Sequence, residues 1–431
     1  MSRVIVIGGG IVGVTSAWAL VNDGHEVTLL EAGQDIAGQT SYANGGQIAV
    51  SDSAPWAAPS VPFKVMSWLG RKDAPFRLRP RLDITQWHWL YLFLLNCRGR
   101  ALSAGTERNL RLATYSLSRL QQTRSTLGND FSYDDSQKGI IRLIDSQKEA
   151  DAARHYFAKH HQDEKIVWME PSELAAKDPA FMSAVERNLI AGAVMCASDE
   201  SGDARIFAKK LAAELENRGV EIHTDCKVTD FVSQRGCVKG VSTEKGGFSA
   251  DRVVLSSGVA SRALARKIGM TIPVLPVKGY SVTVPIIDEN RVPIASCTDL
   301  KHRLVISRLG MRLRVAGFAE IGSDEACDAS RAAAARDRLE ELFPNAADYQ
   351  SFENWTGFRP MTPDGAPIIG EAETLKNVWF NTGHGTLGWT LSHGTAQLLT
   401  DMIAGRETAL DVKPYKIKRS YVIASAKIYK P

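Results

Sequence analysis

The first thirty residues alternate between apolar runs and an amphipathic segment, which predicts a strand, a helix and a second strand. Residues 4–7 are a continuous run of valine and isoleucine, typical of a strand buried on both faces of a parallel sheet. Apolar side chains then recur at helical spacing between Val14 and Val21, and Asn-Asp-Gly at 22–24 ends the helix before a second apolar strand at 26–30. The pattern predicts a βαβ unit at the start of an α/β domain.

A glycine-rich stretch joins the first strand to the helix and fits G-x-G-x-x-G, the pattern of a dinucleotide-binding turn. Gly8 would make the tight turn, Gly10 would let the backbone approach a pyrophosphate, and Gly13 would allow close helix packing. Glu31 ends the second strand 18 positions after Gly13, near the spacing expected of an acid that binds a free ribose hydroxyl. The cofactor-binding residues predicted in this region are Gly8, Gly9, Gly10, Ile11, Val12, Gly13, Glu31 and Ala32.

Two further features favour FAD over NAD. Small and polar residues at 39–46 allow the backbone to run close to a flat ring, which a nicotinamide enzyme has no obvious need for. Near the end of the chain, a short apolar strand, a glycine turn at 381–390 and a helix follow one another again. Backbone N–H groups at such a helix start can stabilise the negative charge of a reduced flavin. The further FAD-binding residues predicted are Thr40, Ser41, Asn44, Gly45, Gly46, Val228, Ser257, Gly258, Gly383, His384, Gly385, Thr386, Leu387, Gly388, Trp389 and Thr390.

The separation of the two glycine turns indicates a discontinuous FAD-binding domain of Rossmann type, accompanied by a second domain of α+β class. The segments assigned to the FAD-binding domain are 1–52, 194–268 and 362–412, and those assigned to the substrate domain are 53–193 and 269–361. Short apolar runs at 281–286, 302–307 and 313–318, with turn residues between them, predict that the substrate domain centres on an antiparallel sheet.

Composition narrows the class of protein. A chain of 431 residues with 44% apolar content can build two domains, and a net charge of +4 gives no general case for a nucleic-acid partner. The six cysteines lie far apart without a Cys-x-x-Cys pair, which predicts no metal site and suits a reducing, cytoplasmic compartment. We expect neither a signal peptide nor a membrane-spanning helix, which needs roughly 18 to 20 apolar residues.

Several motifs resemble one family of flavoenzymes over nearly the whole chain. They are residues 54–59, 199–203, 278–281, 355–365 and 381–389. The chain resembles the D-amino acid dehydrogenase small subunits, within the superfamily of D-amino acid oxidase, glycine oxidase and sarcosine oxidase. The resemblance implies a GR2-like FAD fold, oxidative deamination of D-amino acids and electron transfer to a quinone. The resemblance also implies non-covalent FAD. Some relatives tether the flavin to a cysteine near the C-terminal motif; no cysteine follows Cys327, which excludes that tether and leaves attachment elsewhere open.

Three side chains are candidates for the substrate site. A planar guanidinium binds a carboxylate through two hydrogen bonds, and Arg359 matches the position at which the oxidase relatives hold the substrate carboxylate. Tyr280, predicted near the end of a strand at 272–277, is either a phenol that closes over the substrate or a structural aromatic. His384 either faces the flavin and substrate or fastens the glycine turn. The expected reaction is hydride transfer from the substrate α-carbon to flavin N5, without a general base.

Residues 54–95 and the C-terminal tail have features of a surface that binds a membrane. Residues 54–69 lack clean periodicity and predict an apolar loop, arginines and a lysine follow, and 87–95 is an aromatic apolar run. This pattern suits peripheral contact with anionic lipid on the cytoplasmic face of the inner membrane, or else a core helix beneath a loop over the active site. Residues 413–431 form a basic tail that contributes to the same attraction or is merely solvated.

Two rival functions share these features. One is an oxidase or dehydrogenase of glycine, sarcosine or a hydroxyproline. The other is an FAD-binding redox sensor without turnover. The sequence leaves the oligomeric state, the preferred amino acid and the choice between oxidase and dehydrogenase open.

Overall fold

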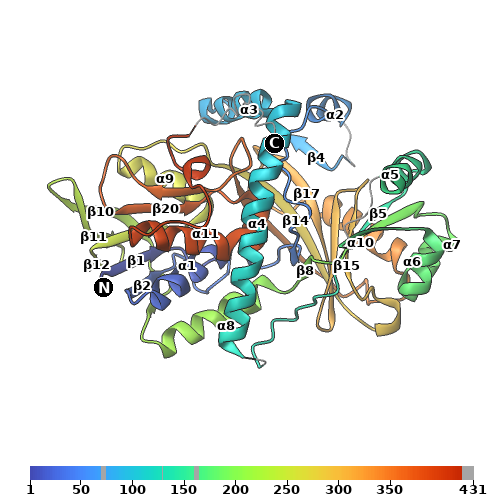
Figure 1. Ribbon diagram of the computed structural model, residues 1–431, viewed down its shortest axis with the longest axis horizontal. Helices are drawn as coiled ribbons and strands as arrows, with labels where there is room; N and C mark the ends of the chain where they lie inside the picture. The colour runs from blue at the N-terminus through green and yellow to red at the C-terminus, as the bar shows by residue number, and fades with distance from the viewer. Residues whose placement is uncertain (69–73, 129, 160–164, 420–431) are drawn as a thin grey trace.

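The computed structural model describes residues 1–68, 74–128, 130–159 and 165–419, and Figure 1 shows two lobes that each contain a large sheet. The helices are α1 Ile11–Asn22, α2 Val61–Trp68, α3 Ile84–Asn96, α4 Gly99–Leu127, α5 Gln147–Lys159, α6 Pro171–Lys177, α7 Met182–Glu186, α8 Ala204–Asn217, α9 Ser261–Lys267, α10 Ala329–Leu342 and α11 Gly388–Ile403. The strands are β1 Arg3–Ile7, β2 Glu26–Leu30, β3 Gln47–Ile48, β4 Phe76–Leu78, β5 Ile140–Ile144, β6 Ile166–Met169, β7 Gly192–Cys196, β8 Glu200–Ser201, β9 Glu221–His223, β10 Val228–Gln234, β11 Cys237–Thr243, β12 Gly246–Ser249, β13 Arg252–Leu255, β14 Leu275–Pro285, β15 Ser296–Asp299, β16 Leu304–Leu309, β17 Arg312–Ile321, β18 Glu353–Met361, β19 Ile368–Glu371 and β20 Val378–Thr382.

The first lobe is a three-layer α/β unit around a sheet of order β19-β20-β13-β1-β2-β9. Strands β9, β2, β1, β13 and β20 run parallel, and β19 is an antiparallel edge. Val4 and Val6 face a core shared with α1, α8 and α11, whereas Ile5 and Ile7 face a core shared with β10–β12 and α9. Because β1 is buried on both faces, its run of branched apolar residues needs no polar alternation. The predicted Rossmann-type fold is confirmed.

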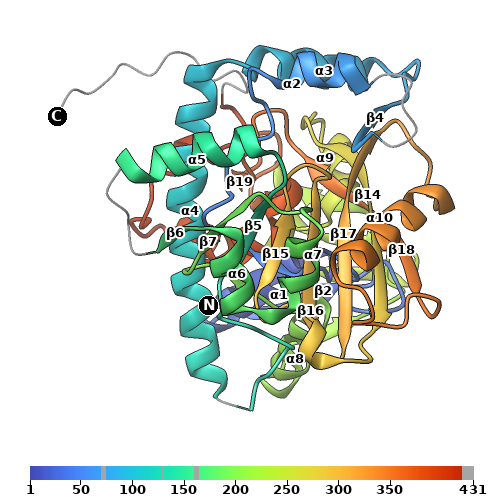
Figure 2. The ribbon, with the colours of Figure 1, turned by 90° about the vertical axis from the view of Figure 1, so that its right-hand side faces the viewer.

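The second lobe contains a nine-stranded sheet of order β18-β14-β17-β16-β15-β5-β7-β6, with β4 pairing to β17. Most pairs are antiparallel, but β15 runs parallel to β5 and β4 parallel to β17. Helix α10 covers one face of β14 and β17, as Figure 2 shows from the side. The other face carries Arg359 and receives a loop from the first lobe. The predicted sheet is therefore present, larger than expected and mixed at two positions.

Two segments depart from the domain boundaries expected from the sequence. Helix α4, assigned to the substrate domain, packs along α11 of the first lobe, where Ser116 Oγ accepts a hydrogen bond from the Gly394 N–H at 3.0 Å (Figure 1). Strand β7 crosses the boundary expected at residue 194 and pairs with β5 and β6 of the second sheet. Both differences arise from contacts between segments that are distant in the sequence, and local periodicity carries no information about such contacts.

The apolar stretch 54–69 is only partly the predicted loop. Residues 61–68 form helix α2, and residue 69 lies outside the described residues together with Arg71 and Lys72. Helix α3 follows, capped by the Asp83 carboxylate, which accepts from the Thr85 N–H at 2.8 Å. In the described part of the chain, no helix is long and apolar enough to span a membrane.

The start of the C-terminal tail is packed rather than merely solvated. Tyr415 is buried, and the Arg419 guanidinium donates to both carboxylate oxygens of the buried Asp364, at 2.9 and 3.1 Å. Arg108 approaches the same carboxylate at 3.5 Å, so burial of Asp364 is compensated by two cations. Residues 420–431, with Lys427 and Lys430, lie outside the described residues.

Candidate active site

The predicted FAD-binding residues follow the carboxyl ends of four neighbouring parallel strands. Gly8 follows β1, Glu31 follows β2, Ser257 and Gly258 follow β13, and Gly383 follows β20. Because parallel strands end at one edge of a sheet, residues more than 350 positions apart in the chain are brought to the same edge. Crevices at this edge are where open α/β sheets bind their ligands.

The first glycine turn leaves no room for a side chain at two of its positions. A Cβ atom on Gly13 would lie 1.7 Å from the Gly8 carbonyl oxygen, and one on Gly8, whose φ is +110°, would lie 2.7 Å from the Ser256 oxygen. Gly10 is the N-cap of α1 and has no side chain to cover the helix start. The turn therefore exposes backbone N–H groups at a helix N-terminus, the arrangement that binds phosphates. This backbone cradle fits the pyrophosphate of a dinucleotide.

Glu31 and Ser41 hold the turn in shape. The Glu31 carboxylate accepts hydrogen bonds from the Gly9 N–H at 2.5 Å and the Gly33 N–H at 2.7 Å. The Ser41 hydroxyl accepts from the Ile11 N–H at 3.1 Å. These contacts place an acid at the end of β2 and a hydroxyl at the start of α1, where the ribose and phosphate groups of the cofactor are expected.

The loop that follows crosses to the second lobe. The Thr40 hydroxyl donates to the Phe358 carbonyl at 2.7 Å, and the Ser307 hydroxyl donates to the Gly45 carbonyl at 2.7 Å. A Cβ on Gly45 would lie 3.0 Å from the Val305 side chain, so its backbone lies directly on β16. This explains why small residues occur here, and it places the loop beside the strand of Arg359.

The second glycine turn is anchored by His384. Its Nε2 lies 3.0 Å from the Thr395 hydroxyl on α11, and an isolated antiparallel bridge links it to Met361 at the end of β18. Burial lowers the pKa of His384 to about 3, so the imidazole is neutral. The contacts match the alternative in which His384 fastens the turn.

The remaining predicted FAD-binding residues lie partly at the carboxyl-terminal edge of the first sheet and partly in the core of the first lobe. The Thr382 hydroxyl donates to the Gly258 carbonyl at 3.2 Å and so joins two of the strand ends. Val228 is buried at the start of β10, whereas Ala32 is exposed. Trp389 is buried, with its ring packed against Tyr133 and Phe207. Trp389 is thus a core residue beneath the turn. The other members of the second turn are Gly385, Thr386, Leu387, Gly388 and Thr390.

Arg359 is a cation that has no carboxylate partner among the residues that the structure describes. Its guanidinium donates to the carbonyls of Phe318 at 2.7 Å and Gly317 at 3.3 Å. Burial lowers the pKa of the Arg359 guanidinium to about 10, and no charged group among the described residues offsets this effect. At neutral pH the group stays charged, and buried cations are usually paired with an anion. An anionic ligand would supply the missing partner.

Glycines make the space around Arg359, and sequence reasoning did not single them out for this role. A Cβ on Gly279 would lie 2.5 Å from the Arg359 guanidinium carbon. Gly357 pairs with Gly279 on the neighbouring strand β18. The Trp56 ring also lies near Arg359, with its centroid 5.9 Å from the guanidinium carbon. The available signal was the presence of three glycines within strand-forming runs, at 279, 317 and 357, which often marks close backbone approach.

Tyr280 does not share a face with Arg359. Strand β14 continues through Gly279 instead of ending at Val277, and its register pairs Val277 with Arg359 and Tyr280 with Thr356. Since side chains alternate along a strand, Tyr280 points to the opposite face, where it is buried beneath α10 near Arg331. The position of Tyr280 corrects the prediction that it closes over the substrate and matches the structural alternative.

Comparison with known proteins decides the family. The family model described as FAD dependent oxidoreductase matches residues 3–402. The chain belongs to this family. The chain is similar to a protein named D-amino acid dehydrogenase from Paramagnetospirillum magneticum, with 40% identity over 97% of this chain and 98% of that protein. A protein of the same name from Granulibacter bethesdensis is 37% identical over 97% of this chain and 99% of that protein.

Solved structures with the same fold include proteins named glycine oxidase and L-proline dehydrogenase. Glycine oxidase from Bacillus cereus superposes with a TM-score of 0.72 at 22% identity, covering 95% of this chain and 99% of that one. L-proline dehydrogenase from P. horikoshii superposes with a TM-score of 0.69 at 18% identity, covering 96% of each chain. At these identities the likeness shows the fold. As an FAD dependent oxidoreductase, the protein is an enzyme whose cofactor is FAD.

Proposed function

We propose that this FAD dependent oxidoreductase is a D-amino acid dehydrogenase that passes electrons to a quinone. The observation that carries the proposal is the Arg359 guanidinium, which is desolvated, lacks a carboxylate partner among the described residues, and lies on a strand that meets the second glycine turn. Full-length relatives at about 40% identity bear the name of this activity. An α-amino acid provides the carboxylate that the guanidinium requires.

The side chains position the substrate rather than exchange protons with it. Arg359 holds the carboxylate, and Gly279 leaves room for the guanidinium, which a side chain at that position would displace. FAD, when bound, supplies the hydride acceptor. His384 is neutral and engaged with Thr395, so the second glycine turn adds no charged base. The balanced reaction converts a D-amino acid, water and a quinone into a 2-oxo acid, ammonium and a quinol.

Flavin reduction under anaerobic conditions tests the substrate class. We expect D-amino acids to bleach the flavin absorbance of the purified protein, whereas L-amino acids, glycine, sarcosine and hydroxyprolines leave it oxidised. Reoxidation by a quinone without peroxide formation would separate dehydrogenase from oxidase. Bleaching by another amine alone would replace the substrate, and a flavin that no amine reduces would favour a redox sensor.

We propose that α2 and α3 attach the enzyme peripherally to an anionic membrane. The two helices lie together at one end of the molecule in Figures 1 and 2. Their exposed large apolar side chains, with Leu82 just before α3, are Phe63, Met66, Leu82, Ile84, Trp87, Tyr91 and Leu94. Exposed arginines flank α3 at positions 79, 81, 98 and 100. Apolar side chains rimmed by cations suit the interface of an anionic bilayer.

Sedimentation with vesicles tests this attachment. We expect the protein to pellet with phosphatidylserine-containing vesicles at low salt and less so at high salt. A Trp87→Ser, Tyr91→Ser double variant should lower the partition coefficient by at least about tenfold, since two aromatic side chains would no longer be buried. The matched control is Ile287→Ser, an exposed apolar residue on the second lobe. Equal pelleting of all three proteins, or none for the wild type, would contradict attachment through this face.

A further inference from the structure

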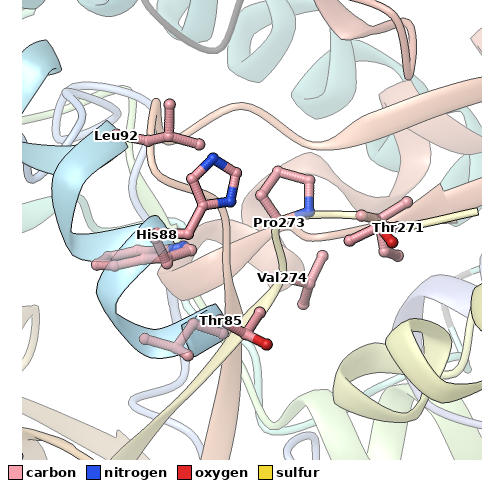
Figure 3. Close-up of a pocket in the computed structure, with 9 residues that line it drawn as sticks. Thr85, His88, Leu92, Thr271, Pro273 and Val274 are labelled. Atoms are coloured by element: carbon pink, nitrogen blue, oxygen red, sulfur yellow. The ribbon is translucent and has the colours of Figure 1, made fainter. Parts of the chain in front are cut away.

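A cavity of about 120 Å³ lies between α3 and the segment 271–275 that leads into β14. Figure 3 shows Thr85, His88 and Leu92 of α3 facing Thr271, Pro273 and Val274 across it. The walls are mainly apolar, with two hydroxyl groups and one imidazole among them. Apolar cavities of roughly 150 Å³ bind a benzene ring. The cavity here is somewhat smaller but open on one side, so it suits a six-membered ring that carries hydrogen-bond acceptors and enters from the open side.

One layer of residues separates this cavity from the second glycine turn. A Cβ on Gly383 would lie 3.5 Å from the Val274 side chain, so the cavity wall contacts the turn. Leu275, also in the wall, pairs with Met361, which bridges to His384. Trp89 in the α3 wall donates to the Met361 carbonyl at 2.9 Å. The wall is thus fixed to the turn predicted to bind the flavin.

The outer side of the cavity is continuous with the apolar face of α3. Trp87 and Tyr91 are half or more exposed, and they lie on the same helix as the cavity residues His88 and Leu92. A molecule dissolved in the lipid would reach the cavity along this helix. The cavity is lined by residues 271–275, whereas Arg359 pairs with Val277 further along β14, so the two sites take different parts of this strand.

We propose that this cavity binds the ring of the quinone that accepts the electrons. The proposal rests on the dehydrogenase function proposed above. The apolar walls would bury the ring, and His88 with Thr85 or Thr271 would donate hydrogen bonds to its carbonyl oxygens. The two electrons and two protons removed from the amino acid end on the quinone, which leaves as the quinol.

Filling the cavity tests the site. We expect Leu92→Trp to lower kcat/KM for a water-soluble short-chain quinone by at least about tenfold, since the added ring occupies the space. The matched control is Leu94→Trp, on the exposed side of the same helix. Anaerobic flavin reduction by D-alanine and reoxidation by ferricyanide, an ion unsuited to an apolar cavity, should be unchanged in both. Normal quinone turnover by Leu92→Trp would overturn the proposal.

Photolabelling gives a readout independent of turnover. An azidoquinone irradiated with the holoenzyme should label peptides containing residues 84–96 or 271–275, and excess unlabelled quinone or Leu92→Trp should suppress that labelling. Labels confined to other peptides would overturn the site. If no amine reduces the flavin, dithionite can reduce it instead, and quinone reoxidation is then followed. The cavity is thereby tested separately from the proposed substrate.

Discussion

Replacing Arg359 with methionine is expected to lower kcat/KM for D-amino acids by about 100- to 1000-fold, the range for truncating one partner of a buried charge pair. Methionine keeps much of the side-chain volume and removes the guanidinium N–H groups that we propose bind the carboxylate. Arg359→Lys should recover only part of the loss, because an ammonium lacks the planar two-donor geometry. Steady-state kinetics with a soluble acceptor measure the effect.

The same substitution should leave the folded holoenzyme intact. Arg359 has no carboxylate partner among the described residues, so its removal breaks no ion pair there and relieves the desolvation of a cation. The contrasting control is Arg331→Met, on the opposite face of the sheet, where the arginine lies 3.0 Å from the buried Glu320 carboxylate. That change should lower the melting temperature and spare KM in the folded protein. Normal turnover by an Arg359→Met protein that retains FAD would contradict the proposed role.

Gly13→Ala is expected to weaken FAD binding by about 100-fold or more, equivalent to about 3 kcal/mol, the upper end of the usual cost of overpacking. Alanine favours a helix over glycine by about 1 kcal/mol, which acts in the opposite direction. The clash dominates, because the new Cβ would lie 1.7 Å from the Gly8 oxygen and would push α1 away from the turn. The dissociation constant can be measured by flavin fluorescence during reconstitution of the apoprotein.

Two glycine variants control for that experiment. Gly99 begins α4 with open space around it, so Gly99→Ala should bind FAD normally. Gly388 lies on the second turn, where a Cβ would meet His384 at an ordinary contact distance of 3.8 Å, and Gly388→Ala should be close to normal. Full FAD occupancy in Gly13→Ala, or equal losses in all three variants, would contradict the close-packing explanation.

The parts of the site that sequence reasoning predicted are those encoded locally. The first glycine turn and Glu31 stand within one βαβ unit, and their spacing alone indicates a dinucleotide fold. The Arg359 candidate depended on a motif match, and its desolvated setting became visible only when β14, β17 and β18 were aligned. Tyr280 shows the limit, because a strand predicted to end at Val277 gives no register for Tyr280, whereas β14 continues through it and fixes the face to which its side chain points.

Helix α3 shows that apolar periodicity alone does not identify which face of a helix is buried. The apolar run at 87–95 left open a core helix or an interfacial one, and α3 is packed on one side and exposed on the other. Trp89 faces the core, whereas Trp87 and Tyr91 face outward. A helix with apolar residues on both faces cannot be oriented from its own sequence, since the partner that defines the buried face comes from β14, β17 and β18.

The strand order of the first sheet has a consequence for synthesis on the ribosome. Strand β1 emerges first, but its neighbour β13 is made about 250 residues later and β20 about 370 later. The cofactor edge is therefore complete only when α11, near the end of the chain, has left the exit tunnel. Until then the nascent chain carries an unpaired apolar strand, a species prone to aggregation. FAD can therefore bind the complete edge only after α11 has been synthesised, and chaperone capacity together with flavin supply would govern the yield of active enzyme.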